Sequence, residues 1–483
     1  MKRLINLGFL VLLFSAAGCV FEDEQSINAD EIFIKYYGTS KEERAVDLVE
    51  LKRSGGSEYL ILGTRQNDVN DIDYLLIKTD SLGVRLWERT YRAKETFSLD
   101  IPNALTLYDC TNDMDCNKVI IAGTSSVGNE SHAYIVAVDL ASDGVVYGDL
   151  NYQYFASDHS ESARFVNTTC NKIIPYNDNA GLGFISVGSV AEFNDRGTSV
   201  LVSRFESSAI SQDLSVGFLS KEVDVEILSD ELRSNSDEAG FARDSIFNYE
   251  STTIYQGDED GVDVIMVKSN PSMSDKEAAF YYLANFSGVD GNKITIGAFE
   301  GENASIDDFN PMEFAVEGNH FGSELMYDGA AKLRVVGTTI NGASQNAFEV
   351  NVGLNLKGQD YNKYTFSIDN SGSSADENWK TSGEDLVRSK YGKMFVLGQV
   401  LDYKEGANQI LKGSEIVLMS ADAESNINED AVQVMGGIGD DDGKAMIIRE
   451  DGSIVIAATT DFGGSAFMIT LVKTNSRGEL LKE

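Results

Sequence analysis

The stretch "EYLILGTRQNDVNDIDYLLIKTDSLGVRLWERTY", residues 58–91, decides the fold of this chain. Two apolar runs, Tyr59–Leu62 and Tyr74–Ile77, flank a polar loop, and segment 80–83 then turns the chain into a third run that contains Trp87. Short runs that are rich in Ile, Leu and Tyr and bounded by Gly, Asn and Asp are typical of β-strands. The stretch therefore predicts three consecutive strands.

This pattern repeats along the chain. Most copies have a second apolar run after a polar loop, and an apolar segment such as "AVDLVEL" from Ala45 precedes the first run. Successive copies begin about 59 to 80 residues apart. The seven copies of the first run are "YLILGTR" from Tyr59, "KVIIAGTS" from Lys118, "GFISVGSV" from Gly183, "TTIYQGD" from Thr252, "KLRVVGTT" from Lys332, "KMFVLGQV" from Lys393 and "SIVIAATT" from Ser453.

With a fourth strand of the "RLWERTY" type, each unit has four strands and no helical periodicity between them. Such units predict an all-β chain folded as a β-propeller, because a β-sandwich lacks a long period and a β-helix repeats on a much shorter one. Seven blades are favoured. Eight are the alternative, in which "NKITIGAF" from Asn292 heads a reduced extra unit.

The two ends of the chain predict how the ring closes. The last copy, "FMITLVKTNSRGELLKE", stops soon after its third strand, whereas "EIFIKYYG", Glu31–Gly38, is a strand that precedes the first unit. Pairing this N-terminal strand with the last blade would complete that blade and cover its exposed edge.

The N-terminus has the features of an export signal. Lys2 and Arg3 precede an apolar segment, Leu4–Phe14, that is too short to span a bilayer, and small residues lead into Cys19. This segment resembles the lipobox of bacterial lipoproteins, although Ala16 stands where that family more often has Leu. The resemblance implies that residues 1–18 are removed and that Cys19 is lipidated. An ordinary signal peptide with an incidental cysteine is the alternative.

An acidic tether, residues 19–30, follows and includes "FEDEQ". It resembles the acidic tract of Bacteroidetes-type lipoproteins that are exported to the outer face of the outer membrane. The resemblance implies a lipid-anchored location in the outer membrane, at the cell surface, with the propeller domain spanning residues 31–483. A short acidic linker without targeting meaning is the alternative.

The charge of the chain excludes one class of partner. Among 483 residues, 39 are basic and 77 are acidic, which gives a formal charge of −38. Such a surface repels the phosphate backbone, so nucleic acid is not expected as a partner.

The repeats resemble a known family. The succession of "YLILG", a polar loop and "DYLLIKTDSLG" is similar to surface-anchored β-propeller lipoproteins of Bacteroidetes type, most of which have no assigned activity. Residues 37–91 and 436–478 match best, and residues 205–330 keep little of the turn signature. The resemblance implies a β-propeller fold and a location at the cell surface, and it does not imply a reaction.

Few residues suggest chemistry, and we predict no catalytic residue. The three histidines, His132, His159 and His320, are not spaced as metal ligands, and no nucleophile or phosphate-binding motif occurs. We interpret Asp80 as a turn residue that binds its own backbone and Trp87 as blade packing.

Two further groups are candidate sites. Asp440, Asp441 and Asp442 form a cluster that could bind Ca²⁺, although a solvent-facing acidic loop explains it as well. Apart from this candidate, we expect no cofactor. Cys110 and Cys116 are predicted to form a disulfide in an exported protein, which leaves Cys170 free. A bridge from Cys170 to the neighbouring blade is the alternative.

Two functions follow from these observations. The first is a non-enzymatic binding or scaffold module at the cell surface, for a glycan, a peptide or an outer-membrane protein such as a nutrient-uptake transporter. Its aromatic segments 151–155 and 361–366 would offer stacking platforms, or would pack within strands. The second is a propeller hydrolase or lyase that acts on a polysaccharide. The ligand itself is not readable from the sequence.

Replacing Cys19 with Ser tests the anchor. Because the acyl group would be the attachment to the membrane, we expect the Cys19→Ser protein to leave the membrane fraction and to lose metabolic labelling with palmitate. Persistent labelling of this variant would refute lipidation at Cys19.

Overall fold

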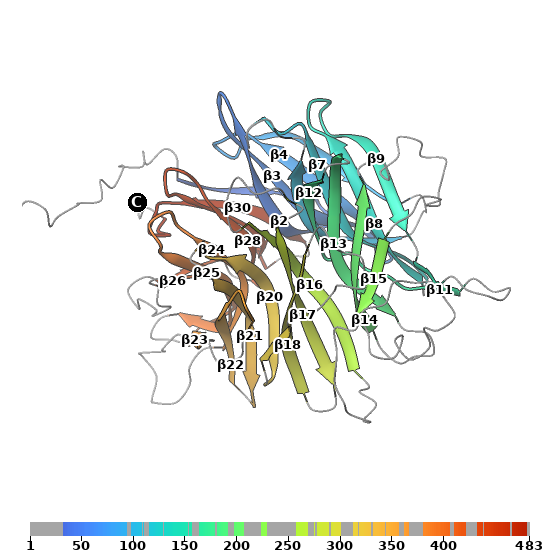
Figure 1. The fold of residues 1–483 in the computed structure, drawn as a ribbon. Helices are drawn as coiled ribbons and strands as arrows, with labels where there is room; N and C mark the ends of the chain where they lie inside the picture. Colours follow the sequence, from blue (N-terminus) through green and yellow to red (C-terminus); the bar gives the residue numbers. More distant parts are fainter. Residues whose placement is uncertain are drawn as a thin grey trace, which may run out of the picture.

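The predicted apolar runs form β-strands in the computed structural model, and together they build an all-β structure (Figure 1). Alternating inward side chains and tight Gly- or Asp-containing turns explain why the chain folds back on itself so often. The structure describes residues 32–480 apart from 94–97, 109, 111–114, 129, 153, 157–163, 179–180, 192–197, 207–223, 229–256, 269–274, 276–277, 289–290, 301–312, 317, 330–331, 343, 357–361, 367–379, 406–409, 422–431, 438 and 464–465.

Consecutive strands pair antiparallel into four-stranded units, here called blades; blades are numbered along the chain, and the strands of each are given from the innermost outward. A single parallel pairing, Ile72 with Leu99, joins blades 1 and 2 into one eight-stranded sheet. Blade 1 contains β2 (Glu42–Arg53), β3 (Gly56–Asp68), β4 (Asp71–Thr79) and β5 (Arg85–Tyr91), and blade 2 contains β6 (Leu99–Tyr108), β7 (Lys118–Val127), β8 (Glu130–Asp139) and β9 (Val145–Tyr152). Blade 3 contains β12 (Lys172–Asp178), β13 (Gly181–Ala191), β14 (Thr198–Glu206) and β15 (Asp224–Leu228), and blade 4 contains β16 (Gly257–Val267), β17 (Ala279–Gly288), β18 (Gly291–Glu300) and β19 (Glu313–Val316). Blade 5 contains β20 (His320–Tyr327), β21 (Lys332–Asn341), β22 (Ser344–Gly353) and β23 (Asn362–Phe366), and blade 6 contains β24 (Lys380–Arg388), β25 (Met394–Glu405), β26 (Ile410–Ala421) and β27 (Gln433–Met435). Blade 7 contains β28 (Asp442–Ile448), β29 (Ile454–Asp461), β30 (Phe467–Thr474) and β1 (Phe33–Tyr37), and a separate hairpin pairs β10 (Tyr154–Ala156) with β11 (Arg164–Val166).

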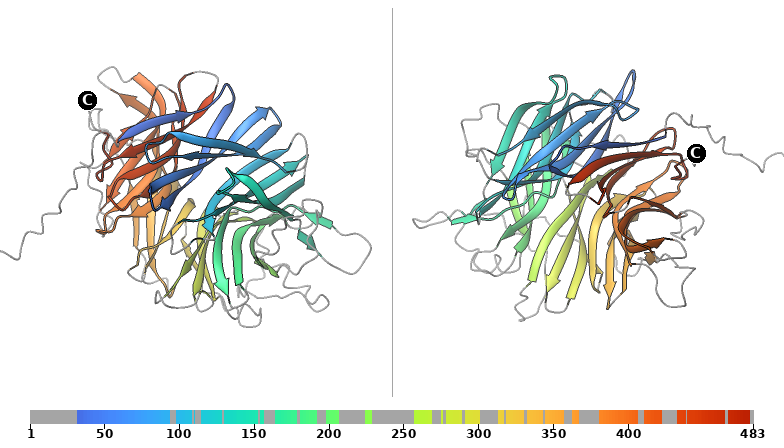
Figure 2. Two further views of the ribbon diagram at one scale, coloured as in Figure 1. Left: turned by 90° about the horizontal axis from the view of Figure 1, so that it is seen from above. Right: turned by 180° about the vertical axis from the view of Figure 1, so that it is seen from behind.

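The blades follow one another around a ring, which is the β-propeller arrangement. In Figure 2 their order runs from blue through green and yellow to red, and the first and last blades are neighbours, as the contacts of β2 with β28, β29 and β30 also show. The described strands amount to seven four-stranded units. The blade number of the whole chain stays a prediction.

The N-terminal strand closes the ring as predicted. β1 pairs antiparallel with β30, from Phe33 opposite Lys473 to Tyr37 opposite Ile469, and so becomes the outermost strand of blade 7. Tyr37 is buried, and its hydroxyl donates a 2.6 Å hydrogen bond to the carbonyl of Gly83 in blade 1. One strand therefore joins the last blade to the first.

The glycine that ends most of the repeated apolar runs, as in "YLILGTR" and "KMFVLGQV", has a steric cause. The innermost strand of blade 6 bulges between Gly383 and Asp385, and this brings the carbonyl of Ser382 against the second strand. A Cβ at Gly398 would lie 1.8 Å from that carbonyl oxygen. Gly63 faces the carbonyl of Arg44 in the same way. The repeat therefore needs a small residue where the innermost strand bulges.

Blade 4 departs from this pattern, and the sequence analysis assigned it wrongly. The run "VDVIMV", Val262–Val267, would be the second apolar run of the fourth copy, but it lies in β16, the innermost strand. "NKITIGAF" lies in β18 of the same blade and does not head an extra unit. Thr252 lies outside the described residues. Here the strictly small residue is Gly261 on the innermost strand, and Ala284 stands opposite on β17. The glycine of "TTIYQGD", Gly257, is the first residue of β16, so this copy was aligned with the second strands of other blades although it leads into an innermost strand.

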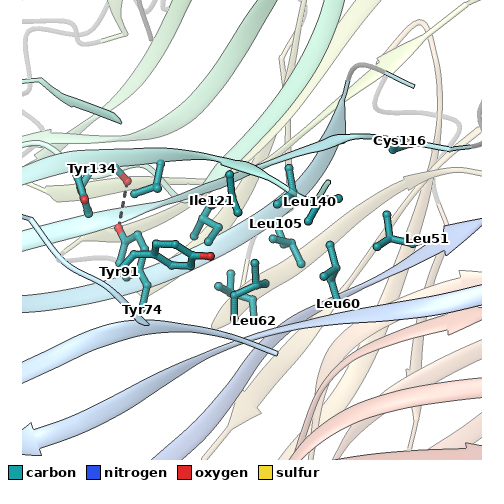
Figure 3. Close-up of a cluster of buried hydrophobic side chains, with 14 of the residues drawn as sticks. Leu51, Leu60, Leu62, Tyr74, Tyr91, Leu105, Cys116, Ile121, Tyr134 and Leu140 are labelled. Atoms are coloured by element: carbon teal, nitrogen blue, oxygen red, sulfur yellow. Dashed lines mark hydrogen bonds between the residues drawn. The ribbon is translucent and has the colours of Figure 1, made fainter. Parts of the chain in front are cut away.

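The core lies between neighbouring blades, as Figure 3 shows for blades 1 and 2. Side chains of β3 and β4 pack against those of β6, β7 and β8, and Leu60, Leu62 and Ile121 have no exposed surface. The hydroxyl of Tyr74 donates a 3.1 Å hydrogen bond to the carbonyl of Tyr134, so this buried polar group is satisfied across the blade interface.

Asp80, Trp87 and the cysteines of blades 1 to 3 also have defined partners or environments in the structure. One carboxylate oxygen of Asp80 accepts hydrogen bonds from the backbone of Leu82 and Val84, which makes it a turn residue, and Trp87 packs against the core of blades 1 and 2. Cys110 is bonded to Cys116 and Cys170 is a buried free thiol, which is the favoured arrangement. Within the described part of the chain, no helix is long and apolar enough to cross a membrane.

Deleting residues 31–38 tests the closure. The deletion exposes the edge of β30 and removes the buried Tyr37, so we expect the thermal midpoint to fall by well over the roughly 2 to 4 °C that a ~1 kcal/mol change causes in a large domain. Deleting residues 20–27 of the tether is the control and should leave the midpoint unchanged. Equal midpoints for the two deletions would contradict the closing role of β1.

Candidate functional site

One position on the innermost strand recurs in every described blade. It faces the residue before the small position of the second strand, as Asp47 faces Leu62. In six of the seven described blades a bulge directly precedes it. The seven equivalent residues, here called the inner ring, are Asp47, Ala104, Lys172, Asp263, Glu324, Asp385 and Ala445. Four carboxyl groups and one ammonium group thus meet at the centre of the propeller.

Three aspartates of the inner ring tie neighbouring blades together. One oxygen of Asp47 accepts a 2.7 Å hydrogen bond from the backbone N–H of Leu48, and the other accepts a 2.7 Å bond from Leu105 in blade 2. Asp263 bonds Leu325 of blade 5 at 2.7 Å in the same way, and Asp385 bonds Met446 of blade 7 at 2.6 Å. These carboxylates are therefore committed to the scaffold.

Lys172 supplies the positive charge of the inner ring. Its Nζ lies 3.6 Å from Oδ1 of Asp263 and 3.4 Å from Oε1 of Glu324. Burial by itself lowers the pKa of Lys172, but the carboxylates of Asp263 and Glu324 raise it well above its ordinary value. Lys172 therefore stays protonated and links blade 3 to blades 4 and 5.

The excess of carboxyl groups shifts their own titration. Burial raises the pKa of Glu324 well above its usual range, and the charge of Asp263 raises it further while Lys172 lowers it. Burial also raises the pKa of Asp385 to about 6, against the opposing effects of the Met446 N–H and Lys172. The fold therefore favours the protonated forms of Glu324 and Asp385.

Sequence reasoning missed the inner ring, although a signal was present. Four innermost strands carry a small residue, any residue, an acid and an aliphatic residue in succession, as in "AVDL" from Ala45, "GVDV" from Gly261, "GSEL" from Gly322 and "GEDL" from Gly383. Aligning these segments would have placed the acids at equivalent positions.

A pocket of about 480 Å³ opens on the face where the innermost strands begin, here called the top face. Lys380 and Asp442 are the first residues of β24 and β28, and Phe467 is the first residue of β30. Four blades, 5, 6, 7 and 1, contribute to the wall. The lining residues are Arg44, Gln345, Lys380, Gln399, Leu401, Gly413, Ser414, Asp440, Asp442, Thr459 and Phe467.

The pocket combines an aromatic platform with groups that donate and accept hydrogen bonds. The guanidinium of Arg44 lies 3.9 Å from the centre of the Phe467 ring, and its Nε donates a 2.7 Å bond to Glu42. Oδ1 of Asp440 accepts bonds of 3.1 and 3.3 Å from the N–H and hydroxyl of Ser414. Opposite charges therefore line one polar cavity.

The structure does not gather the three predicted calcium ligands. Asp440 bonds Ser414, whereas buried Asp441 bonds the N–H groups of Gly437 and Asp461. Asp442 pairs with Lys444, 2.9 Å away. In the described part of the chain, no group of acidic, histidine or cysteine side chains is arranged to hold a metal ion. Calcium binding by Asp440, Asp441 and Asp442 stays a prediction.

The other predicted residues lie apart from the pocket. Cys19 and His159 lie outside the described residues. His132 is in β8, and His320 is in β20, where its Nε2 lies 2.7 Å from Nζ of Lys363. Segment 362–366 is the outer strand β23, so it is part of a blade and not a loop.

Comparison with known proteins finds structural likenesses and supplies no activity. No family model matches the sequence, and no curated protein matches it. The chain is similar to the periplasmic gluconolactonase PpgL of Pseudomonas aeruginosa, with 11% identity, a TM-score of 0.44 and coverage of 90% of this chain and 97% of that one. It is also similar to the Nup133 β-propeller domain of Vanderwaltozyma polyspora (10%, 0.39, 91% and 100%) and the SCAP WD40 domain of fission yeast (8%, 0.35, 94% and 97%). At these identities and TM-scores no activity is transferred.

Replacing Asp385 with Asn tests the electrostatics of the inner ring. Its folded-state pKa of about 6 lies above the unfolded value, so its stabilising contribution is complete at low pH and is lost as the pH rises through 6. The free energy of unfolding of the wild type should fall as the pH rises from 5 to 7. The same rise in pH should cost the Asp385→Asn variant roughly 1 kcal/mol less. Denaturant unfolding at both pH values measures this difference.

Asp451→Asn is the matched control for this experiment. Although burial opposes it, hydrogen bonds from Ser453 and the charge of Arg449 lower the pKa of Asp451, so this carboxyl is ionised in both states from pH 5 to 7. The control should keep the pH dependence of the wild type. If Asp385→Asn also kept the pH dependence of the wild type, the raised pKa of Asp385 would be contradicted.

Proposed function

We propose that this protein is a lipid-anchored, surface-exposed protein of the outer membrane that binds a glycan in the top-face pocket without chemically changing it. The pocket carries this proposal. Sugar rings present apolar faces and hydroxyl groups that both donate and accept, and the pocket offers a ring, amides, cations and carboxylates on one wall.

The Arg44–Phe467 pair supports this ligand class. A guanidinium held against an aromatic ring keeps its remaining N–H groups directed and ready to donate to hydroxyl groups. Asp440 has one oxygen bonded to Ser414, which leaves its other oxygen to accept from a ligand. Gln345 and Gln399 add amides from blades 5 and 6. The set favours an uncharged or weakly acidic oligosaccharide.

The arrangement of the carboxylates supports binding over turnover. Glycoside hydrolysis needs two carboxyl groups placed on either side of the scissile bond. The aspartates at the centre bind backbone N–H groups of two blades, and Asp442 in the pocket pairs with Lys444. The export signal and the acidic tether support a location at the cell surface. As the partner of a glycan-binding module at that location, we propose a nutrient-uptake transporter.

Phe467→Ala tests the pocket. We expect the mature protein to bind at least one member of an oligosaccharide panel in calorimetry, and the loss of the platform to weaken binding roughly 5- to 30-fold, as for a loss of 1–2 kcal/mol. Asp440→Asn should also weaken binding, and it retains the oxygen that accepts from Ser414. Phe462→Ala removes an exposed aromatic ring outside the pocket wall and should bind as the wild type does.

The same samples separate binding from catalysis. Chromatography of the panel after long incubation should show no products. Product formation that Asp440→Asn or Asp442→Asn abolishes, with the fold intact by circular dichroism, would establish the polysaccharide hydrolase or lyase instead.

A further inference from the structure

Exposed apolar side chains gather on one arc of the propeller rim, toward the face opposite the pocket. They lie on β1, β5 and β9, the outermost strands of blades 7, 1 and 2, and on the turn between β4 and β5. Between 37% and 55% of the surface of each is exposed. The six residues, here called the apolar rim, are Ile34, Leu82, Val84, Leu86, Val145 and Val146.

The apolar rim is a continuous surface, because each turn rests on the outer strand of the blade before it. The hydroxyl of Tyr37 in β1 bonds the carbonyl of Gly83, and the hydroxyl of Tyr91 in β5 bonds the carbonyl of Gly144 at 2.8 Å. Gly83 has φ of +72°, and a Cβ there would contact Phe33. The two turns are thereby fixed against β1 and β5.

The charges on this arc nearly cancel, in contrast to the formal charge of −38 for the chain. Lys35, Arg85 and Arg89 are the cations of β1 and β5, and Glu88 pairs with Arg85 and Arg65. Asp80, Asp139 and Asp143 lie at the turns and Asp149 lies on β9, so three cations and five acids share this arc. A nearly neutral apolar surface can approach lipid headgroups that would repel a strongly acidic surface.

The start of the described chain lies at the same arc. β1 begins at Phe33, at the end of blade 7 that is remote from the pocket, and Phe33 is fourteen residues after Cys19. Fourteen extended residues span at most about 50 Å. A lipid on Cys19 would therefore keep this arc within about 50 Å of the membrane.

We propose that the apolar rim lies against the surface of the membrane that anchors Cys19, and that this contact turns the top face with its pocket outward. The inference rests on the proposed lipid anchor. It adds an orientation, because a tether alone lets the propeller rotate freely, whereas a second contact on the rim fixes which face meets the medium.

Vesicle flotation of the mature, unlipidated Cys19→Ser protein tests this contact. Phosphatidylethanolamine–phosphatidylcholine vesicles should carry a measurable fraction of the protein. In the Cys19→Ser background, the combined change Leu82→Ser, Val84→Ser and Leu86→Ser should lower the partition coefficient about tenfold, because exposed apolar area is lost. The matched control, Val69→Ser with Val127→Ser, alters exposed apolar residues in turns of the top face and should partition like its parent.

The outcomes separate the rim from the anchor. The rim contact is overturned if the Cys19→Ser protein does not float with the vesicles. It is also overturned if the rim variant and the control variant lose flotation equally while their thermal midpoints are unchanged. A concentration-dependent dimer in sedimentation, lost only in the Leu82, Val84 and Leu86 variant, overturns it in favour of an interface between copies. Acyl labelling of the wild type reports on the anchor alone, so flotation without labelling refutes the anchor and retains the rim.

Discussion

The structure depends on the hydrogen bonds that carboxylates of the innermost strands accept from the next blade. Each blade is a small sheet that cannot bury its faces alone, so the ring must hold neighbouring blades in register. Asp47, Asp263 and Asp385 do so by accepting one N–H from their own strand and one from the following blade. The bulge before each of them turns the side chain to that position, and the small residue on the second strand makes room for the bulge.

This solution places several acids close together, and the chain offsets the cost in two ways. Lys172 takes the equivalent position in blade 3 and neutralises part of the charge of Asp263 and Glu324. Burial and mutual repulsion raise the pKa of Glu324 and Asp385, which favours their protonated forms. The polar groups at the centre are thus used to build the scaffold. The pocket at the top face, where Asp440 and Arg44 retain capacity for further hydrogen bonds, is left as the place for a ligand.

Much of the fold could be predicted from the sequence, because the repeat signal is a local steric rule. A glycine or alanine after the apolar run marks the second strand where the bulge presses on it. The unpaired strand at Glu31–Gly38 predicted the closure that β1 makes with β30. Blade 4 was misread because "TTIYQGD" was aligned with the second strands of the other blades, whereas its Gly257 begins the innermost strand, β16.

The candidate site was much harder to predict. Arg44 and Phe467 stand at opposite ends of the sequence and meet only because the ring closes. Each lining residue is ordinary in its own segment, and no spacing along the chain marks the eleven as a group. The inner ring is different, because aligning the acids that follow the small residue of four strands would have found it.

A crystal structure of the mature protein with a bound oligosaccharide tests the division between scaffold and site most directly. The account predicts a sugar ring beside the Arg44–Phe467 pair, a hydroxyl group within hydrogen-bond distance of Asp440, and inner-ring carboxylates that keep their bonds to Leu105, Leu325 and Met446. A sugar bound at the centre of the propeller, against Glu324 and Lys172, would contradict it.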